Sequence, residues 1–318
     1  MARSPKLSIV IRTYNEEKHI GRLLEGISRQ SFRDAEIIIV DSGSTDATLA
    51  MANRYPVKVV PIPPEEFTFG RSLNRGCAEA SGEFLVFASA HVYPTYPDWL
   101  EQLLSGFNDP EVALVYGKQR GDSTTKFSEH QIFTKLFPDQ SNPRQDHPFC
   151  NNANAAIRRA LWLQRPYDET LSGLEDLEWG KWALAEGHTL AYSASAEIIH
   201  KHEESPGQVY NRYRREALAL KQIQPEEIFR LNDFVRLLLF NVFSDCRQAL
   251  DAKILYKSLG EIVLFRIMQF WGTYKGLRHT GRVGLDLIHT FYYPTRFGES
   301  RLYTDRETAP IDYSLYED

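Results

Sequence analysis

The chain has 318 residues, of which 42% are hydrophobic and 25% are charged, and its formal net charge is −5. This composition fits one large or two smaller folded cores and excludes disordered and fibrous classes. Three widely spaced cysteines without a CxxC pair, and a start without a secretory signal, predict no disulfide framework and a reducing cytoplasm as the location.

The first ninety residues alternate between short apolar runs and segments with helical spacing. Strands are predicted at 7–11, 36–40, 57–62 and 83–88, and helices at 17–29, 46–52 and 73–80. Regular alternation is typical of an α/β fold of the Rossmann-like kind, with a mostly parallel sheet and helices on both faces.

Polar residues follow three of these strands, in the loops at 12–16, 41–46 and 89–93. In a parallel sheet the ligand lies beyond the carboxyl ends of the strands, so Thr13, Asp41 and His91 are expected to converge on one crevice. An alternative for Asp41 is that it only caps the helix that follows.

Several segments resemble one known family in their order and approximate spacing. They are LSIVIRTYNE at 7–16, EIIIVDSGSTD at 36–46, FGRSLNRG at 69–76, the triplet SAH at 89–91 and LEDLEW at 174–179. Together they resemble the family 2 glycosyltransferases of the GT-A fold over residues 6–205. The stretches at 67–76 and 266–275 are similar to a rhamnosyltransferase-like branch.

The resemblance implies a nucleotide-sugar donor and assigns residues to it. The base and ribose would be held by four residues, Thr13, Tyr14, Glu16 and Asp41. Arg71 and Asn74 would lie on the loop that turns toward the nucleotide, and Ser89 would begin the triplet in the family's DxD position.

The resemblance also implies the catalytic group. Asp176, beside Glu175, matches the carboxylate that deprotonates the acceptor hydroxyl in inverting members. Trp179 shares a helical face with Asp176, and it is either an aromatic platform for the sugar or part of the core.

The SAH triplet departs from the DxD pattern, in which two aspartates suit Mg²⁺ or Mn²⁺. Some related transferases carry DxH and a second histidine, and this implies a divalent metal at His91 with either His200 or His202. Periodicity does not choose between the two, and His202 is favoured because it lies nearer the end of the run. The alternative is metal-independent catalysis, with His91, Arg71 or Lys201 neutralising the phosphates.

The segment at 121–145 is long and polar. It is expected to be either a functional loop that folds over the donor or a disordered insertion.

The last third of the chain is predicted to be helical, at 208–223, 228–246 and 252–274. Expected domains are therefore a GT-A domain at 1–205, a helical region at 206–289 and an extended arm at 290–318.

The helical part is basic, because residues 206–301 hold 15 Lys and Arg against 9 Asp and Glu. It is either packed on the transferase domain or rests on a membrane, with six basic residues near lipid headgroups, namely Lys253, Lys257, Arg266, Lys275, Arg278 and Arg282. No nucleic-acid partner is expected, and a homodimer is possible.

The sequence therefore predicts an inverting glycosyltransferase that moves a sugar to a saccharide or lipid-linked acceptor, in cell-surface polysaccharide synthesis at the inner face of the membrane. A sugar nucleotidyltransferase is one alternative, but it should have a glycine-rich loop after the first strand, and residues 12–16 contain no glycine. A catalytically silent sugar- or nucleotide-binding module is the other alternative.

Overall fold

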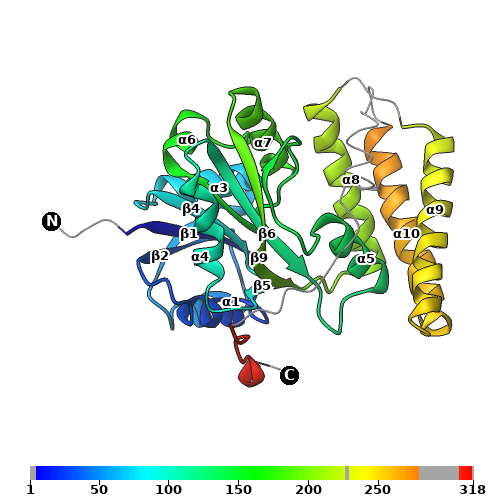
Figure 1. Cartoon of the computed structure of the whole chain (residues 1–318), viewed down its shortest axis with the longest axis horizontal. Coiled ribbons are helices and arrows are strands. Elements are labelled where there is room, and N and C mark those ends of the chain that lie inside the picture. The colour runs from blue at the N-terminus through cyan, green and yellow to red at the C-terminus, as the bar shows by residue number, and fades with distance from the viewer. Residues whose placement is uncertain (1–4, 226–228, 279–307, 317–318) are drawn as a thin grey trace.

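The computed structural model describes residues 5–225, 229–278 and 308–316. Within these residues, one nine-stranded sheet lies between helices and is followed by three long helices at one side (Figure 1). The strands are β1 Leu7–Thr13, β2 Ala35–Asp41, β3 Val57–Pro61, β4 Phe84–Ser89, β5 Val92–Pro94, β6 Val112–Arg120, β7 Asn142–Gln145, β8 Asn154–Arg158 and β9 Thr189–His200.

The strand order is β3-β2-β1-β4-β8-β6-β9-β5, and β7 also pairs with β9. The first four strands are parallel, as predicted. The second half mixes directions, since β8 runs antiparallel to both β4 and β6 while β6 and β9 are parallel. The sheet therefore has a parallel half and a mixed half, and β4 ends near the boundary between them.

Helices cover both faces of the sheet because the parallel strands are apolar on both sides. On one face Ile9 and Ile11 of β1 pack with the helices α1, α2 and α4, and on the other face Val10 packs with α3, α6 and α7. These helices are α1 Ile20–Ser28, α2 Thr48–Ala52, α3 Phe69–Ala78, α4 Trp99–Leu104, α6 Arg159–Gln164 and α7 Glu175–Ala185, with short 3₁₀ turns at Pro64–Glu66, Ser105–Asn108 and Ser314–Tyr316.

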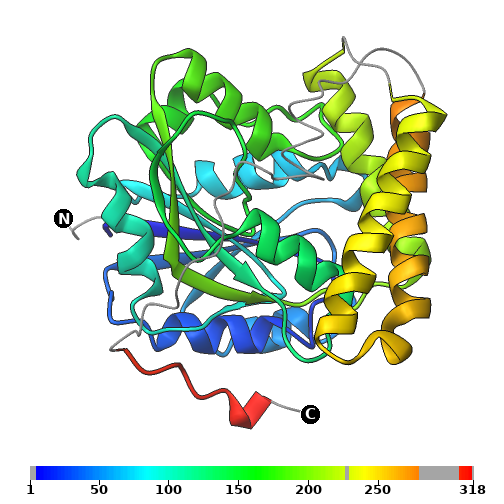
Figure 2. The ribbon, with the colours of Figure 1, turned by 45° about the vertical axis from the view of Figure 1, so that its right-hand side comes forward.

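The C-terminal helices are α8 Pro206–Ile223, α9 Leu231–Asp251 and α10 Leu255–Leu277. They lie side by side at the edge of the sheet domain, as both views show (Figure 2). Leu177 of α7 joins a cluster with residues of all three helices, so this region is packed on the sheet domain. In the described part of the chain, no helix is both long and apolar enough to span a bilayer.

The expectation of a structureless segment at 121–145 is wrong. This segment contains α5, Phe127–Leu136, and strand β7. Its polar residues are ordered by partners far along the chain, because Glu129 pairs with Arg212 of α8 and Ser128 donates to Asp245 of α9. A local pattern contains no information about such distant partners.

A buried ion pair connects the helical region to α5. The guanidinium of Arg266 donates from Nε to Asp245 Oδ2 at 2.7 Å and from Nη2 to the Ser128 carbonyl at 3.3 Å. Ser128 Oγ donates to the same Asp245 oxygen at 2.6 Å. Both charged residues are almost fully buried, so each charge depends on the other.

The prediction that Arg266 faces lipid headgroups is therefore wrong, since its side chain is buried. Lys253 and Lys257 are exposed at the turn between α9 and α10, near exposed apolar side chains such as Leu250 and Tyr256. Arg282 lies outside the described residues. Membrane contact and a homodimer stay predictions.

The expected C-terminal arm is described only at 308–316. This piece lies against α1 and the edge strand β5 (Figure 2). Ile311 donates its N–H to the Thr95 carbonyl at 2.9 Å, and Tyr313 Oη donates to the Pro94 carbonyl at 2.7 Å.

Replacement of Arg266 by methionine should lower the free energy of unfolding by about 3–5 kcal/mol, because Asp245 would stay buried without a counter-charge. Chemical denaturation monitored by circular dichroism measures this loss. The double variant with Asp245→Leu should recover part of it, since no isolated charge remains. If Arg266→Met alone were as stable as the wild type, the buried charge of Asp245 would not depend on Arg266.

Candidate active site

Two adjoining cavities lie at the carboxyl ends of the parallel strands. The main cleft has a volume of about 720 Å³ and a smaller, more apolar pocket has about 390 Å³. Five residues line both cavities, namely Arg12, Glu16, Phe69, Ser89 and His91. The cavities therefore meet where β1 and β4 end.

The smaller pocket contains most of the residues predicted to hold a nucleoside. Three of the four residues predicted to hold the base and ribose, Thr13, Tyr14 and Glu16, line it, and so does Ser89 of the SAH triplet. Tyr14 is 57% exposed, and Phe67 lines the same pocket. Aromatic side chains beside small hydroxyl groups suit a flat base attached to a ribose.

Asp41 lies beneath this pocket and is 4% exposed. Its carboxylate accepts hydrogen bonds from the Thr13 hydroxyl at 3.0 Å and from the backbone N–H groups of Gly43 and Ser44. The side chain thus holds the loop after β2 and is not among the lining residues of either cavity. Its predicted contact with the base stays a prediction.

Arg71 and Asn74 lie on α3, outside the lining of both cavities. Arg71 Nε donates to Glu169 Oε2 at 2.8 Å, and Asn74 Nδ2 donates to Glu169 Oε1 at 3.0 Å and to the Tyr167 carbonyl at 2.9 Å. These bonds hold the segment around 167–169 against α3. A nucleotide contact for either residue stays a prediction.

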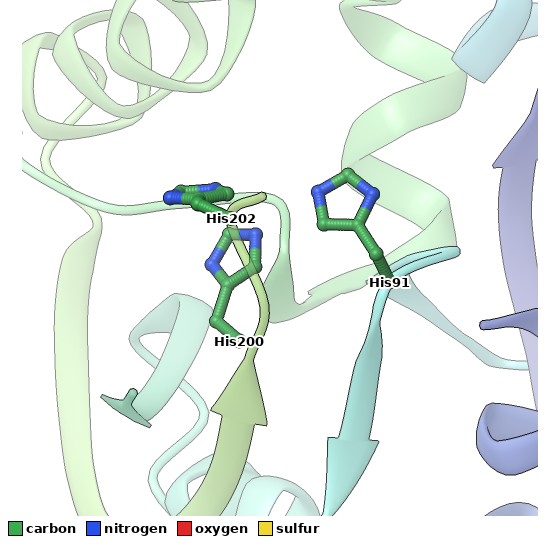
Figure 3. Close-up of side chains that lie close together, drawn as sticks. All are labelled: His91, His200 and His202. Atoms are coloured by element: carbon green, nitrogen blue, oxygen red, sulfur yellow. The ribbon is translucent and has the colours of Figure 1, made fainter. Parts of the chain in front are cut away.

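Three histidines lie together in the main cleft. His91 follows β4, His200 ends β9 and His202 comes two residues later, and their rings face one another (Figure 3). One nitrogen of each ring lies within 4.8 Å of the others. The sequence predicted either His200 or His202 as the partner of His91, with His202 favoured. The structure brings both of them to His91.

Partners outside the cluster orient two of the rings. His200 Nδ1 lies 2.7 Å from Gln119 Oε1, and His202 Nδ1 lies 2.6 Å from Glu129 Oε1. Both partner oxygens accept hydrogen bonds, so each Nδ1 carries the proton and each Nε2 keeps its lone pair. His91 is held by Glu16 Oε1, 2.9 Å from its Nδ1, and by the Ser89 hydroxyl, 3.1 Å from its Nε2.

The donor set fits a divalent transition metal. The buried His200 Nε2 has no hydrogen-bond partner among the described residues. Burial lowers the pKa of His200 well below its usual value and, with Arg212, lowers that of His202, so both rings are neutral ligands. Imidazole nitrogens suit Mn²⁺ better than Mg²⁺, which prefers oxygen.

Glu129 and Arg212 support the cluster from α5 and α8. Although burial alone would raise it, the pKa of Glu129 is lowered to about 2 by His202 and Arg212. A permanently ionised carboxylate keeps the His202 proton on Nδ1. Sequence reasoning missed both supporting residues, because neither lies near a recognised motif.

The two predicted catalytic carboxylates begin α7. Leu174, just before them, has a left-handed backbone with φ of 58°, which is strained for a non-glycine residue. Glu175 Oε1 pairs with Arg12 Nη1 at 3.0 Å. Asp176 accepts backbone hydrogen bonds from Asn152 at 2.9 Å and from Leu177 at 2.8 Å. Both carboxylates line the same cleft as the histidines.

The environment of Asp176 raises its affinity for a proton. Burial, together with the negative charge of Glu175, raises the pKa of Asp176 to about 7, although Arg12 and two backbone N–H groups act in the opposite direction. A carboxylate with this pKa can accept a proton near neutral pH and is basic enough to hold it.

Trp179 is fully buried and donates from Nε1 to the Arg165 carbonyl at 2.7 Å. It belongs to the core cluster on one face of the sheet. The interpretation as a sugar platform is wrong, and the core alternative holds.

Comparison with known proteins identifies the class. The family model described as "Glycosyl transferase family 2" matches residues 8–163. The O-antigen chain rhamnosyltransferase WbaN of Salmonella anatum is 29% identical over 227 residues, which cover 66% of this chain and 70% of the relative. RfbN of Salmonella typhimurium, also an O-antigen chain rhamnosyltransferase, is 25% identical over 65% of this chain and 70% of its own length.

The fold is that of a solved glycosyltransferase. The mannosyltransferase PcManGT from Pyrobaculum calidifontis, in complex with GDP-Man and Mn²⁺, superposes with a TM-score of 0.63 at 17% identity, over 87% of this chain and 88% of that chain. Residues 8–163 therefore belong to glycosyltransferase family 2, and the chain has the GT-A fold.

The histidine cluster should bind Mn²⁺ in the absence of any substrate. His200→Ala should weaken Mn²⁺ binding about tenfold or more, since it removes a ligand that is already desolvated. Electron paramagnetic resonance of free Mn²⁺ in a titration of metal-free protein measures the affinity. His188→Ala, at a histidine outside the cleft, is the matched control. Equal affinities of the wild type and His200→Ala would remove His200 from the metal site.

Proposed function

We propose that this glycosyltransferase transfers a sugar from a nucleotide-sugar donor to a hydroxyl acceptor with inversion at the anomeric carbon. One observation carries the proposal: a carboxylate with a raised pKa and a cluster of three histidines line one cleft beside a nucleoside-sized pocket. Deprotonation of the acceptor hydroxyl and stabilisation of the departing diphosphate would therefore be the tasks of different side chains.

The smaller pocket would take the nucleoside, with Tyr14 and Phe67 beside the base and Thr13 near the ribose. The diphosphate would pass Ser89 and His91 into the main cleft, because both residues line the two cavities. When bound, Mn²⁺ held by His91, His200 and His202 would supply positive charge beside the departing diphosphate.

Asp176 would act on the acceptor. Its carboxylate takes the proton of the incoming hydroxyl while the oxygen attacks the anomeric carbon, and the bond to the diphosphate breaks on the opposite side of the sugar. The configuration inverts because attack and departure occupy opposite faces. Arg12 holds Glu175 beside the base and so fixes the start of α7.

The relatives suggest the biological setting. WbaN and RfbN are O-antigen chain rhamnosyltransferases, which supports a deoxyhexose as the donor sugar and a lipid-linked or saccharide acceptor in cell-surface polysaccharide synthesis. PcManGT was solved with GDP-Man and Mn²⁺, which supports a nucleotide-sugar donor and a divalent cation.

Asp176→Asn should reduce transfer by about 10²- to 10⁴-fold, the usual loss for a general base, while nucleotide binding is unchanged. Nucleotide affinity by calorimetry and release of nucleoside diphosphate from UDP-, dTDP- and GDP-sugars test both parts. Loss of nucleotide binding in a folded variant would count against Asp176 as the base. A wild type that turns over none of these donors, with or without acceptor, would favour a silent binding module.

The pH dependence should follow the ionisation of Asp176. Because the proton acceptor must be ionised and its pKa in the free protein is about 7, kcat/KM should be half-maximal near pH 7 and should fall about tenfold per pH unit below that. Glu175→Gln removes the neighbouring negative charge, which lowers the pKa of Asp176 and moves the acid limb to lower pH. An acid limb at the same pH in both proteins would show that another group controls it.

A further inference from the structure

Helix α8 places Arg215 at the junction of the two cavities. The Arg215 guanidinium carbon lies 4.4 Å from the centre of the Phe69 ring, and the Arg12 guanidinium carbon lies 4.8 Å from the same ring. Arg12 and Phe69 line both the nucleoside pocket and the main cleft, and Arg215 lines the main cleft. The side chain therefore lies where the two parts of a sugar nucleotide would be joined.

Arg215 differs from the other arginines of the cleft in its pairing. Arg12 pairs with Glu175 at 3.0 Å, and Arg212 pairs with Glu129 and Glu204, both at 2.7 Å. Among residues 5–225, 229–278 and 308–316, Arg215 forms no ion pair. A guanidinium stays charged at neutral pH even when partly buried, so its charge is available to an anionic ligand.

A purely structural explanation accounts for only part of this arrangement. The contact with Phe69 is a cation–π interaction, and it uses the face of the guanidinium. Its N–H groups lie in the guanidinium plane and remain free to donate, because no hydrogen bond from them is made to another described residue. The backbone carbonyl of Arg215 accepts a hydrogen bond from Ser172 Oγ at 3.1 Å, and this bond does not involve the guanidinium.

We infer that Arg215 binds the diphosphate of the donor and stabilises its charge as it leaves. This inference rests on the proposed function. A sugar nucleotide joins its nucleoside to its sugar through two phosphates, so these groups must cross the junction beside Phe69. The planar fork of a guanidinium matches two phosphate oxygens, and such charge-assisted bonds are among the strongest in proteins. They also gain strength as negative charge grows on the departing oxygen.

The position of Arg215 is fixed by packing. Ala217 and Leu220 of α8 pack with Leu177 of α7, the helix that carries Asp176. A capping box at Ser205 and Gln208 fixes the start of α8. Arg215 lies beyond residues 8–163, which the family model matches, so the helical region would complete the active site.

The experiment compares Arg215→Met with Arg214→Met. Arg214 is the adjacent residue on the same helix, is exposed and lines neither cavity, so it controls for loss of one positive charge. Calorimetry in Mn²⁺ measures the affinities of three pairs of probes, UDP and UMP, dTDP and dTMP, and GDP and GMP. Melting curves by circular dichroism establish that each variant is folded.

For the pair that the wild type prefers, Arg215→Met should weaken diphosphate binding about tenfold to a hundredfold, as expected for lost charge-assisted hydrogen bonds, and leave the monophosphate almost unaffected. Arg214→Met should match the wild type. Arg215→Lys, which keeps the charge without the fork, should fall between them and keeps the test usable if the methionine variant does not fold.

Two outcomes would overturn the inference. Either Arg215→Met keeps the full preference for the diphosphate, or it loses monophosphate and diphosphate affinity equally, as a structural role for Arg215 predicts. The proposed function fails in a different way, namely if the wild type binds none of the six probes. In that case the inference fails with it.

Discussion

The site depends on one short antiparallel pairing, between the three-residue strand β5 and the end of β9. Val92 lies opposite His200 in this register, and the N–H of Lys201 donates to the His91 carbonyl at 3.1 Å. These backbone bonds bring residue 91 to residues 200 and 202, although more than a hundred residues separate it from them in the chain. A shift of the register by one residue would turn His200 to the other face of the sheet.

The same pairing determines where the helical region can attach. The chain leaves β9 at His200 and begins α8 at Pro206, so α8 must start beside the histidines. Arg212 then reaches Glu129, and Arg215 lies against Phe69. The buried Arg266–Asp245 pair connects α10 and α9 to α5, and α5 in turn carries Glu129. The helical region is therefore part of the support for the histidine cluster.

The cleft also concentrates unfavourable groups. Asp176 is buried next to Glu175, which raises its pKa, and Leu174 has a strained backbone conformation. His200 keeps a buried nitrogen without a partner in the described structure. Each of these features lowers the stability of the free protein. A proton would relieve the burial of the Asp176 charge, and a cation would give the buried His200 nitrogen a partner. Such features are expected where binding and catalysis require groups that are ready to react.

The sequence by itself determined the parallel half of the sheet, the long C-terminal helices, the family, and the loops that carry Thr13, Tyr14, Glu16, Ser89 and His91. These features depend on local periodicity and on motifs, which short stretches contain in full. The sequence could not decide between His200 and His202, between core and platform for Trp179, or between a functional loop and a disordered insertion at 121–145, and it did not predict the helix that this segment contains. It also did not show that the Asp41 carboxylate holds its own loop or that Arg71 and Asn74 bind Glu169. Only the tertiary structure decided these points, because strand register, burial and ion pairs such as Glu129 with Arg212 arise from contacts between distant segments.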